Sequence, residues 1–486
     1  MRPRFQLLDE DLADRIITEA ALVLAGIGVE VNDPSVRELL AAHGAEIGDG
    51  DGRVRLGETM VEAALDATPL SFSLYDLAGR ESHRFDGVRT HFTPGSAAIN
   101  ILDRSTGAIR PAVTADLVRM AKLVGGLGRM DAQSTALVSS DVPEAVSDSY
   151  RLFINLLYCG KAVVTGAFTI EGFAVMRELL LAVRGTAEAL AARPPALFTC
   201  CPTSPLRWTD EGVRNLVDCA RSGIPVEIVP VPLTGFMAPV TLVGTLIQHT
   251  AEVLSGVVIA QLAQPGVPLL FGGSPAIFDL RYETTPMGAV ETSMLTSAAA
   301  EIGRRLGMPT QGYIALSDSK ALDAQAGLET GIGATLAALA GIDNVSGPGM
   351  LDFESCQSLE KLVVDHEICL MTDRLRAGIE PRDDFPAQPL LEELLAEKHL
   401  LIADHTRRHL RAELAFPGPV IDRTSRPRWL EEGGRTLGER AAAEVDRLVA
   451  DAAPSPLDED ARRGLEEVMA AAARAAGMDK LPAREA

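Results

Sequence analysis

The chain has 486 residues and a formal net charge of -22; 47% of its residues are hydrophobic and 23% are charged. This is the composition of an ordinary globular protein that is long enough to bury a large core. The excess of acidic residues argues against nucleic acid or an anionic membrane as a partner, because both bind basic surfaces.

Cysteine usage and the amino-terminal sequence both indicate a cytoplasmic protein. The 6 cysteines include no CxxC pair and no spaced framework, which is typical of reduced thiols in the cytosol. The sequence MRPRFQLLDEDLADRII carries acidic residues and lacks an apolar core, so we expect no secretory signal there. The most apolar region, 239–271, is interrupted by polar residues and predicts a buried helix and a strand rather than a membrane span.

The pattern of apolar residues divides the chain into an irregular start and a regular centre. Residues 1–90 predict an accessory layer with helical periodicity at 9–25 and 34–43 and a strand-like piece at 71–75. From residue 91, strand-length apolar runs alternate with helical stretches that often begin with Thr, Ser or Asp. The predicted strands are 91–92, 132–138, 162–168, 196–200, 226–231, 268–271, 312–316 and 344–346. The predicted helices are 115–123, 143–157, 172–183, 209–221, 241–262, 291–306, 323–339 and 357–376.

This alternation predicts an α/β fold built on a (β/α)8 TIM barrel. The strand–helix units span roughly 285 residues, and such barrels typically take about 250. A doubly wound open sheet is the alternative, but it favours a glycine fingerprint after the first strand, where this chain has Thr93-Pro94-Gly95-Ser96. We predict an N-terminal accessory layer at 1–90, the barrel at 91–378 and a C-terminal helical extension at 379–486. The extension is expected to wrap the barrel or a neighbouring subunit.

Candidate functional residues follow from the barrel, because its active sites lie at the carboxyl ends of the strands. Asp318 and Lys320 lie in the polar turn after the seventh predicted strand, and Gly347 follows the eighth. Asp318 and Lys320 either act on a substrate or cap and solvate the turn. Glu227 lies inside an apolar strand, where a carboxylate is costly unless it is paired. Its two interpretations are engagement with a ligand and a salt bridge to a barrel arginine.

Three further features of the sequence are candidates for a functional role. The long connection 272–287 contains Arg281 and Tyr282, and long loops inside a compact fold are often functional. The histidines at 405 and 409 have the spacing of one helix face but no third ligand, so no metal site is predicted. The adjacent Cys200 and Cys201 at a strand end either hold a nucleophile or pack in the core.

Several segments resemble the trimethylamine methyltransferase-like family of corrinoid-protein methyltransferases. They are GGSPAIFDLRYETTPMGAVETSMLTSAAAEIGRRLGMPTQGY, SDSKALDAQAG, LAALAGIDNVSGPGMLD and, in the tail, HTRRHLRAELAFPG. The likeness covers residues 90 to 450 approximately. It implies a barrel enzyme that moves a methyl group from a methylamine or betaine to the Co(I) of a separate corrinoid protein. No tightly bound cofactor of its own is implied, because the corrinoid (cobalamin) belongs to the partner.

The resemblance also narrows the expected substrate. Founding members of the family use pyrrolysine at the site, whereas this chain contains only the twenty standard residues. It therefore resembles the branch that acts on quaternary amines such as glycine betaine, and 317–325, with Lys320, is the expected counterpart of the pyrrolysine position. The alternatives are trimethylamine or another methylamine as donor, a non-catalytic betaine-binding barrel, and a lyase or hydrolase that uses the cysteine pair or Asp318. We expect a homo-oligomer.

The implied chemistry assigns roles to the candidate residues. A quaternary ammonium leaves as a neutral tertiary amine, so the reaction requires orientation and exclusion of water more than an acid or base. Carboxylates and aromatic faces are expected to hold the cation, and a basic side chain is expected to hold a substrate carboxylate. The residues predicted for catalysis are Glu227, Asp318 and Lys320. Those predicted for substrate binding are Phe236, Phe271, Arg281, Tyr282, Tyr313 and Gly347.

Overall fold

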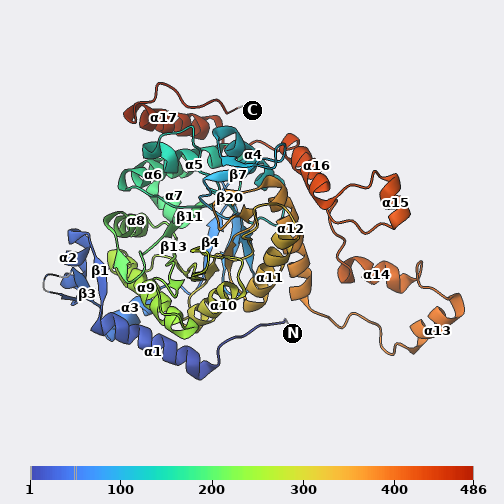
Figure 1. The fold of residues 1–486 in the computed structure, drawn as a ribbon, viewed down its shortest axis with the longest axis horizontal. Helices are drawn as coiled ribbons and strands as arrows, with labels where there is room; N and C mark the ends of the chain where they lie inside the picture. The colour runs from blue at the N-terminus through green and yellow to red at the C-terminus, as the bar shows by residue number, and fades with distance from the viewer. Residues whose placement is uncertain (1–2, 49, 51, 485–486) are drawn as a thin grey trace.

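The computed structural model describes residues 3–48, 50 and 52–484 (Figure 1). Its centre consists of short parallel strands, each followed by a helix that covers them. The central strands are β6 (His91–Thr93), β9 (Gln133–Ser134), β10 (Val163–Thr165), β11 (Ala196–Cys200), β13 (Val226–Ile228), β15 (Leu269–Phe271), β17 (Gln311–Gly312) and β18 (Asn344–Ser346). The covering helices are α4 (Thr114–Gly126), α5 (Glu144–Tyr158), α6 (Ile170–Arg184), α8 (Asp210–Arg221), α9 (Leu242–Ala263), α10 (Val290–Arg305), α11 (Ala324–Ala340) and α12 (Leu359–Ala377). The predicted α/β class is confirmed.

The central strands form two parallel sheets, with the orders β15-β13-β11-β10-β9 and β17-β18-β6. An isolated parallel bridge between Phe271 and Thr310 lies between β15 and the start of β17. On the other side, the amide of Asp131, just before β9, donates to the carbonyl oxygen of Phe92 in β6 over 2.8 Å. Neighbouring strands in sequence are therefore neighbours in space, as the alternating pattern predicts.

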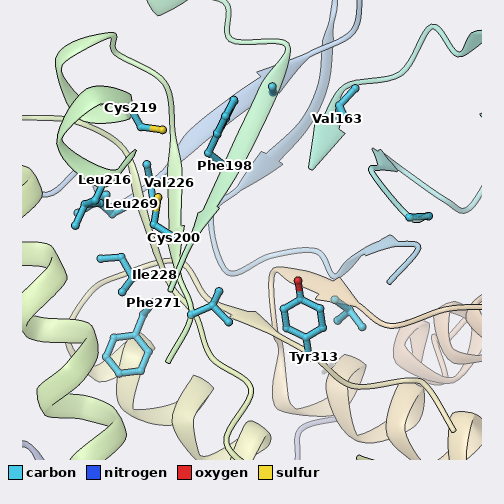
Figure 2. Packing of buried hydrophobic residues seen from close by; sticks show 14 of the residues in the cluster. Val163, Phe198, Cys200, Leu216, Cys219, Val226, Ile228, Leu269, Phe271 and Tyr313 are labelled. Atoms are coloured by element: carbon cyan, nitrogen blue, oxygen red, sulfur yellow. The ribbon is translucent and has the colours of Figure 1, made fainter. Parts of the chain in front are cut away.

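Buried apolar side chains hold the strands to their helices. Phe198, Val226, Ile228, Leu269 and Phe271 are fully buried or nearly so, and Figure 2 shows them around β11, β13 and β15. Each such side chain contributes about 1.5–3 kcal/mol relative to exposure. The β-branched and aromatic residues of these runs favour strands, which is why the short apolar segments fold as they do.

Helix starts are capped by the residue types that the sequence pattern indicated. The side chains of Thr169, Thr209, Thr241, Asp323 and Ser358 accept hydrogen bonds from backbone amides in the first turns of α6, α8, α9, α11 and α12. Each cap contributes about 1 kcal/mol because it satisfies an amide that the helix leaves unpaired. The helix α7 (Ala187–Ala192), capped by Thr186, was not predicted.

The amino-terminal segment packs beside the central α9. It contains α1 (Glu10–Gly26), β1 (Val29–Val31), α2 (Pro34–Ala42), β2 (Glu46–Ile47), β3 (Arg53–Arg55), α3 (Glu58–Ala67), β4 (Phe72–Tyr75) and β5 (Glu81–Phe85). Both α1 and α3 contact α9. By length and composition α9 is apolar enough to cross a membrane, but 72% of its most apolar window is buried. It is a core helix, which confirms the prediction of a buried helix followed by a strand.

The carboxyl-terminal segment has a packed part and an arm that extends from the body. It contains α13 (Gln388–Glu397), α14 (Asp404–Glu413), α15 (Arg426–Glu431), α16 (Leu437–Ala450) and α17 (Glu459–Ala475). Helix α16 contacts α4 and α12, and α17 contacts α5 and α6. Helices α13, α14 and α15 contain no buried residue and lie away from the body in Figure 1.

The remaining short strands lie in the connections. They are β7 (Asn100–Leu102), β8 (Ile109–Pro111), β12 (Arg207–Trp208), β14 (Leu233–Thr234), β16 (Ala276–Ile277), β19 (Met350–Leu351) and β20 (Cys356–Gln357). β19, β20, β7 and β8 form one small sheet, β14 pairs with β16, and β12 pairs with β1 of the amino-terminal segment. Through β12, the amino-terminal segment is tied to the central fold by backbone hydrogen bonds as well as by helix packing.

Candidate active site

A cavity of about 770 Å³ lies at the carboxyl ends of the central strands. Residues that directly follow β9, β10, β11, β13 and β17 contribute to its wall, together with a turn between β19 and β20. Its polar and aromatic lining includes Ser96, Thr135, Arg151, Phe168, Glu171, Thr199, Cys201, Glu211, Asn215, Ser274, Tyr313, Phe353 and Glu354. The cavity is thus at the edge where a parallel α/β fold presents its chemistry.

The cavity explains why several predicted strands are too long at their carboxyl ends. The predicted strands 132–138, 162–168 and 226–231 end at Ser134, Thr165 and Ile228 in the structure. The residues beyond, such as Thr135, Phe168 and Val231, leave the sheet and line the cavity instead. Their apolar and β-branched character resembles that of a strand, so the local pattern does not distinguish them.

Tyr313 contributes a phenol to the wall. Its hydroxyl lies 3.0 Å from the Ser96 Oγ, which holds the ring in place. Burial and the nearby Glu227 carboxyl raise the pKa of Tyr313 well above its usual value, so the phenol stays neutral. In Figure 2 the Tyr313 ring stands apart from the cluster around Phe271, and Tyr313 is the predicted site residue that lines the cavity.

Glu227 lies in β13 and is fully buried. Its Oε1 accepts a hydrogen bond from the Thr199 hydroxyl over 2.7 Å, and its Oε2 accepts one from the Asn344 side-chain amide over 3.0 Å. Burial raises the pKa of Glu227 to about 7, although both hydrogen bonds oppose that shift. No arginine or lysine pairs with it within the described ranges, so the salt-bridge interpretation is wrong: two neutral donors, Thr199 on the neighbouring strand β11 and Asn344 on β18, satisfy this carboxyl.

Asp318 and Lys320 lie behind the wall rather than in it. The Asp318 carboxylate accepts hydrogen bonds from the amides of Met287 and Gly288, both over 2.9 Å, and so anchors the segment that leads into α10. Burial and the neighbouring Glu329 raise the pKa of Asp318 to about 6. The Lys320 Nζ donates to the Asp318 carbonyl oxygen over 2.7 Å and lies 3.8 Å from the centre of the Phe353 ring.

The other predicted binding residues lie outside the cavity wall. Phe236 is 63% exposed and stacks on Phe278, and Phe271 is buried against His249. Tyr282 is exposed, and the Arg281 guanidinium beside it pairs with Asp279 over 2.6 Å.

Gly347 also lies outside the wall and serves the packing of two segments. A Cβ at this position would lie 2.1 Å from the Ile314 carbonyl oxygen. Glycine is therefore required by the close approach of two backbones, which a side chain would prevent.

The four charged residues of the wall, Arg151, Glu171, Glu211 and Glu354, were missed from the sequence. Arg151 lies in α5, is almost fully buried, pairs with Asp148 over 2.9 Å and stacks 4.8 Å above the Phe168 ring. Its Nε is buried and has no hydrogen-bond partner within the described part of the chain. The signal was an arginine within the apolar stretch Tyr150–Phe153 of a helix.

Glu354 is another of these four residues. It lies in the turn Asp352–Glu354, whose three residues all have positive φ, at 50°, 55° and 68°. Burial and the Asp318 charge raise the pKa of Glu354 to about 8. In the sequence, the indication was that Asp352-Phe353-Glu354 directly follows the apolar pair Met350-Leu351.

Of the cysteine pair, Cys201 is poorly suited to act as a nucleophile. Both Cys200 and Cys201 contribute to the cavity wall. Cys201 is exposed as a residue, but desolvation of its sulfur and the Cys200 sulfur beside it raise the pKa of the Cys201 thiol to about 12. A thiol needs to ionise to attack, so this environment disfavours the predicted alternative of a cysteine-dependent lyase or hydrolase.

Comparisons with known proteins give one consistent relationship. The family model described as trimethylamine methyltransferase (MTTB) matches residues 1–477. The trimethylamine methyltransferase MttB of Desulfitobacterium hafniense is 28% identical over 456 residues, covering 93% of this chain and 90% of that protein. The glycine betaine methyltransferase of D. hafniense strain Y51 is 28% identical over 458 residues, covering 94% of this chain and 95% of that protein.

A solved structure agrees at the level of the fold. The crystal structure of the Methanosarcina barkeri monomethylamine methyltransferase (MtmB) superimposes with a TM-score of 0.52, at 11% identity over 96% of this chain and 89% of that one. That likeness supports the arrangement of strands and helices. With the family match over almost the whole chain, it leads to one conclusion: the chain belongs to the trimethylamine methyltransferase (MTTB) family, whose named relatives are methyltransferases.

Proposed function

We propose that the protein transfers a methyl group from a quaternary amine of the glycine betaine type to the Co(I) of a corrinoid carried by a separate protein. The observation that carries the proposal is that one cavity is lined by both Arg151, whose Nε has no hydrogen-bond partner among the described residues, and the carboxyl group of Glu354. A betaine carries both a cation and a carboxylate, so such a wall complements both ends of it. The likeness to a glycine betaine methyltransferase supports the same donor.

The reaction places modest demands on the protein. The bond between carbon and nitrogen breaks with its electron pair on nitrogen, and the methyl carbon accepts an electron pair from Co(I). The amine leaves neutral, so no side chain has to supply a proton. The neutral Tyr313 phenol and the buried Glu227 therefore act by orienting and by shaping the field of the cavity. We retain both as site residues, with Asp318 and Lys320 supporting the wall from behind.

The proposed architecture is a closed (β/α)8 barrel at 91–378, with an accessory layer at 1–90 and an extension at 379–486. The parallel bridge Phe271–Thr310 and the hydrogen bond from Asp131 to Phe92 support closure between the two sheets. The cavity then occupies the open end of the barrel, where a docked corrinoid protein would reach the substrate. A cytoplasmic location remains the prediction from the cysteines.

A direct assay tests the donor. The purified protein is incubated with glycine betaine, proline betaine, carnitine or trimethylamine and with a reduced corrinoid protein or free cob(I)alamin. We expect at least one betaine to form methyl-cobalt, which is measured by visible absorbance. The same reaction should release the tertiary amine that has one methyl group fewer than the donor, which is measured by mass spectrometry. Transfer from trimethylamine alone would favour that donor instead. Tight binding of a betaine with no demethylation would indicate a non-catalytic binder, and no binding or transfer with any donor would rule the proposal out.

We further propose that the protein is a homo-oligomer and that the arm α13–α15 packs against a second copy. Helices of ten residues or fewer are marginal in water unless they bury an apolar face, and these bury none in the single chain. The arm begins after Ala377, the last residue of α12. Ala377 and His91, the first residue of β6, line one cavity, so the arm leaves the body near the amino-terminal ends of the strands. The corrinoid protein has to approach the opposite edge, so a second copy is the better occupant of the arm.

Charged substitutions on the arm test this arrangement. Leu391 and Leu395 are one turn apart on α13 and are 54% and 70% exposed. The double variant Leu391→Lys/Leu395→Lys is expected to weaken self-association by about 100-fold or more, because burying each leucine is worth about 1.5–3 kcal/mol. Light scattering after size exclusion measures it, with Leu22→Lys, a leucine 59% exposed on α1, as the matched control. An unchanged mass for the arm variant, or a monomeric wild type, would contradict the proposal.

A further inference from the structure

Glu354 has a buried carboxyl oxygen that the protein itself does not satisfy. The residue lines the cavity, and its Oε1 has no hydrogen-bond partner among the described residues. Leaving a buried acceptor unsatisfied costs about 1–3 kcal/mol. Native proteins leave few such groups, and one in a cavity wall calls for an explanation beyond packing.

The turn that presents Glu354 is itself costly and is held in place. Three successive residues with positive φ are unusual outside glycine, and each costs about 1 kcal/mol. The turn is fixed by the Asp352 amide, which donates to the Ser319 carbonyl oxygen over 3.0 Å, and by the Ser355 hydroxyl, which donates to the Asp352 carboxylate over 2.7 Å. Backbone strain of this kind persists where the surrounding structure holds a functional side chain in position.

In the described part of the chain, neither of the two nearby protein cations, Arg151 and Lys320, forms an ion pair with Glu354. Arg151 pairs with Asp148, and Lys320 donates to the Asp318 carbonyl oxygen. The same two cations lie over the rings of Phe168 and Phe353, at 4.8 and 3.8 Å from the ring centres. Each of these rings therefore has one face occupied by a protein cation. The aromatic faces that are left do not by themselves balance the charge of a bound ammonium group.

We propose that Glu354 binds the quaternary ammonium group of the substrate, an assignment that rests on the proposed function and names the residue that holds the cation. A quaternary ammonium has no N–H, so it stabilises a carboxylate by charge and contact without a directed hydrogen bond. The full positive charge of the ligand stabilises the ionised Glu354 carboxylate even though no hydrogen bond forms between them. Glu171 and Glu211 at the exposed part of the wall add to the negative potential that attracts a cation.

A proton should leave Glu354 when the cation binds. The pKa of Glu354 is raised to about 8, so at pH 7 the free protein holds this carboxyl mainly in its neutral form. A cation favours the ionised form, and binding is therefore coupled to the release of about one proton at pH 7. Affinity rises with pH up to about 8 and levels off above it. The charge that raises the pKa of Glu354 is that of Asp318, and Tyr313 also interacts with Glu354. The other titratable or charged groups nearby are Asp352 with its partner Lys320 and, in the same wall, Arg151, Glu171, Cys201 and Glu211.

Calorimetry with a matched pair of ligands tests the assignment. Glycine betaine and tert-butylacetate have the same shape, but the second has carbon in place of the charged nitrogen. The wild type is expected to prefer glycine betaine and to release about one proton at pH 7, measured in two buffers of different ionisation enthalpy. Glu354→Gln is expected to bind glycine betaine about tenfold more weakly or worse and to release no proton. Glu178→Gln, at an exposed glutamate of α6 that does not line the cavity, is the control and should keep both the affinity and the proton release.

The outcomes separate this assignment from the proposed donor. Equal binding of the two ligands by the wild type, or an unchanged affinity and proton release in Glu354→Gln, would overturn the role of Glu354. If no betaine binds, the donor proposal fails, and tetramethylammonium then serves as the probe. Binding of tetramethylammonium that depends on Glu354 would still support the cation site, and its absence would overturn it. Near-ultraviolet circular dichroism checks that Glu354→Gln is folded, which is expected because the amide has the shape of the neutral carboxyl that it replaces.

Discussion

Replacing Lys361 by methionine is expected to lower the free energy of unfolding by about 3–5 kcal/mol. The Lys361 Nζ is fully buried, donates to the Thr330 hydroxyl over 2.8 Å and pairs with the Asp365 carboxylate over 2.5 Å. That carboxylate also accepts the amide of Gly349, in the turn after β18, over 2.7 Å. Removing the ammonium leaves a buried carboxylate with no charge partner, which costs far more than the lost pair alone.

The measurement is chemical denaturation with a matched control. Arg15 pairs with Glu19 with the same i,i+4 spacing as Lys361 and Asp365, but its side chain is 72% exposed. Arg15→Met is expected to change stability by less than about 1 kcal/mol. The double variant Lys361→Met/Asp365→Leu should recover a large part of the loss, because no charge then stays buried alone. A loss in Lys361→Met as small as that in Arg15→Met would refute this account of the pair.

Replacing Glu227 by glutamine is expected to remove a pH dependence of stability between about pH 5 and 8. The pKa of Glu227 is raised to about 7 in the folded protein, above its ordinary value of 4.5, because burial favours the neutral carboxyl. A raised carboxyl pKa gives a stabilising contribution that is complete below pH 4.5 and is lost as the pH rises through about 7. The loss amounts to about 3 kcal/mol at pH 8, since one pKa unit corresponds to about 1.4 kcal/mol.

Comparison of three proteins by denaturation at pH 5 and pH 8 measures the effect. The free energy of unfolding of the wild type should fall relative to that of Glu227→Gln as the pH rises, because only the wild type has a carboxyl that ionises at this position. Thr199→Val removes a donor that lowers the pKa of Glu227, so this variant should become more pH-dependent than the wild type. A stability difference between Glu227→Gln and the wild type that does not change with pH would contradict the assigned protonation.

The regular part of the fold was predictable because its signals are local. The predicted helices 115–123, 143–157 and 323–339 match α4, α5 and α11 to within a few residues. Helical and strand periodicities, and caps such as Thr209 and Ser358, involve residues a few positions apart. The predicted strands failed mainly at their carboxyl ends, where residues such as Thr135 and Phe168 keep strand-like character while they line a cavity.

The candidate site depends on contacts that no local pattern contains. The buried carboxylate of Glu227 was recognisable as costly, but its partner Asn344 is 117 residues away and its partner Thr199 lies on the neighbouring strand. Aromatic residues near strand ends were expected around the substrate, yet Phe271 faces the core and Phe236 faces solvent. Alternation along a strand sends successive side chains to opposite faces, and the packing of the whole molecule decides which face is the cavity.

The amino-acid sequence alone was sufficient for the α/β class, the alternation of strands and helices, the family resemblance and the edge of the strands at which chemistry is expected. It singled out the polar turn Ser317–Lys320, and in the folded chain the Asp318 carboxylate of this turn accepts hydrogen bonds from the amides of Met287 and Gly288. Arg151 and Glu354 come to one cavity from segments 203 positions apart by their numbering, and one of them is presented by a left-handed turn that residue types do not foretell. Local energetics specify the elements, and only the closure of the tertiary fold brings their distant side chains to one place.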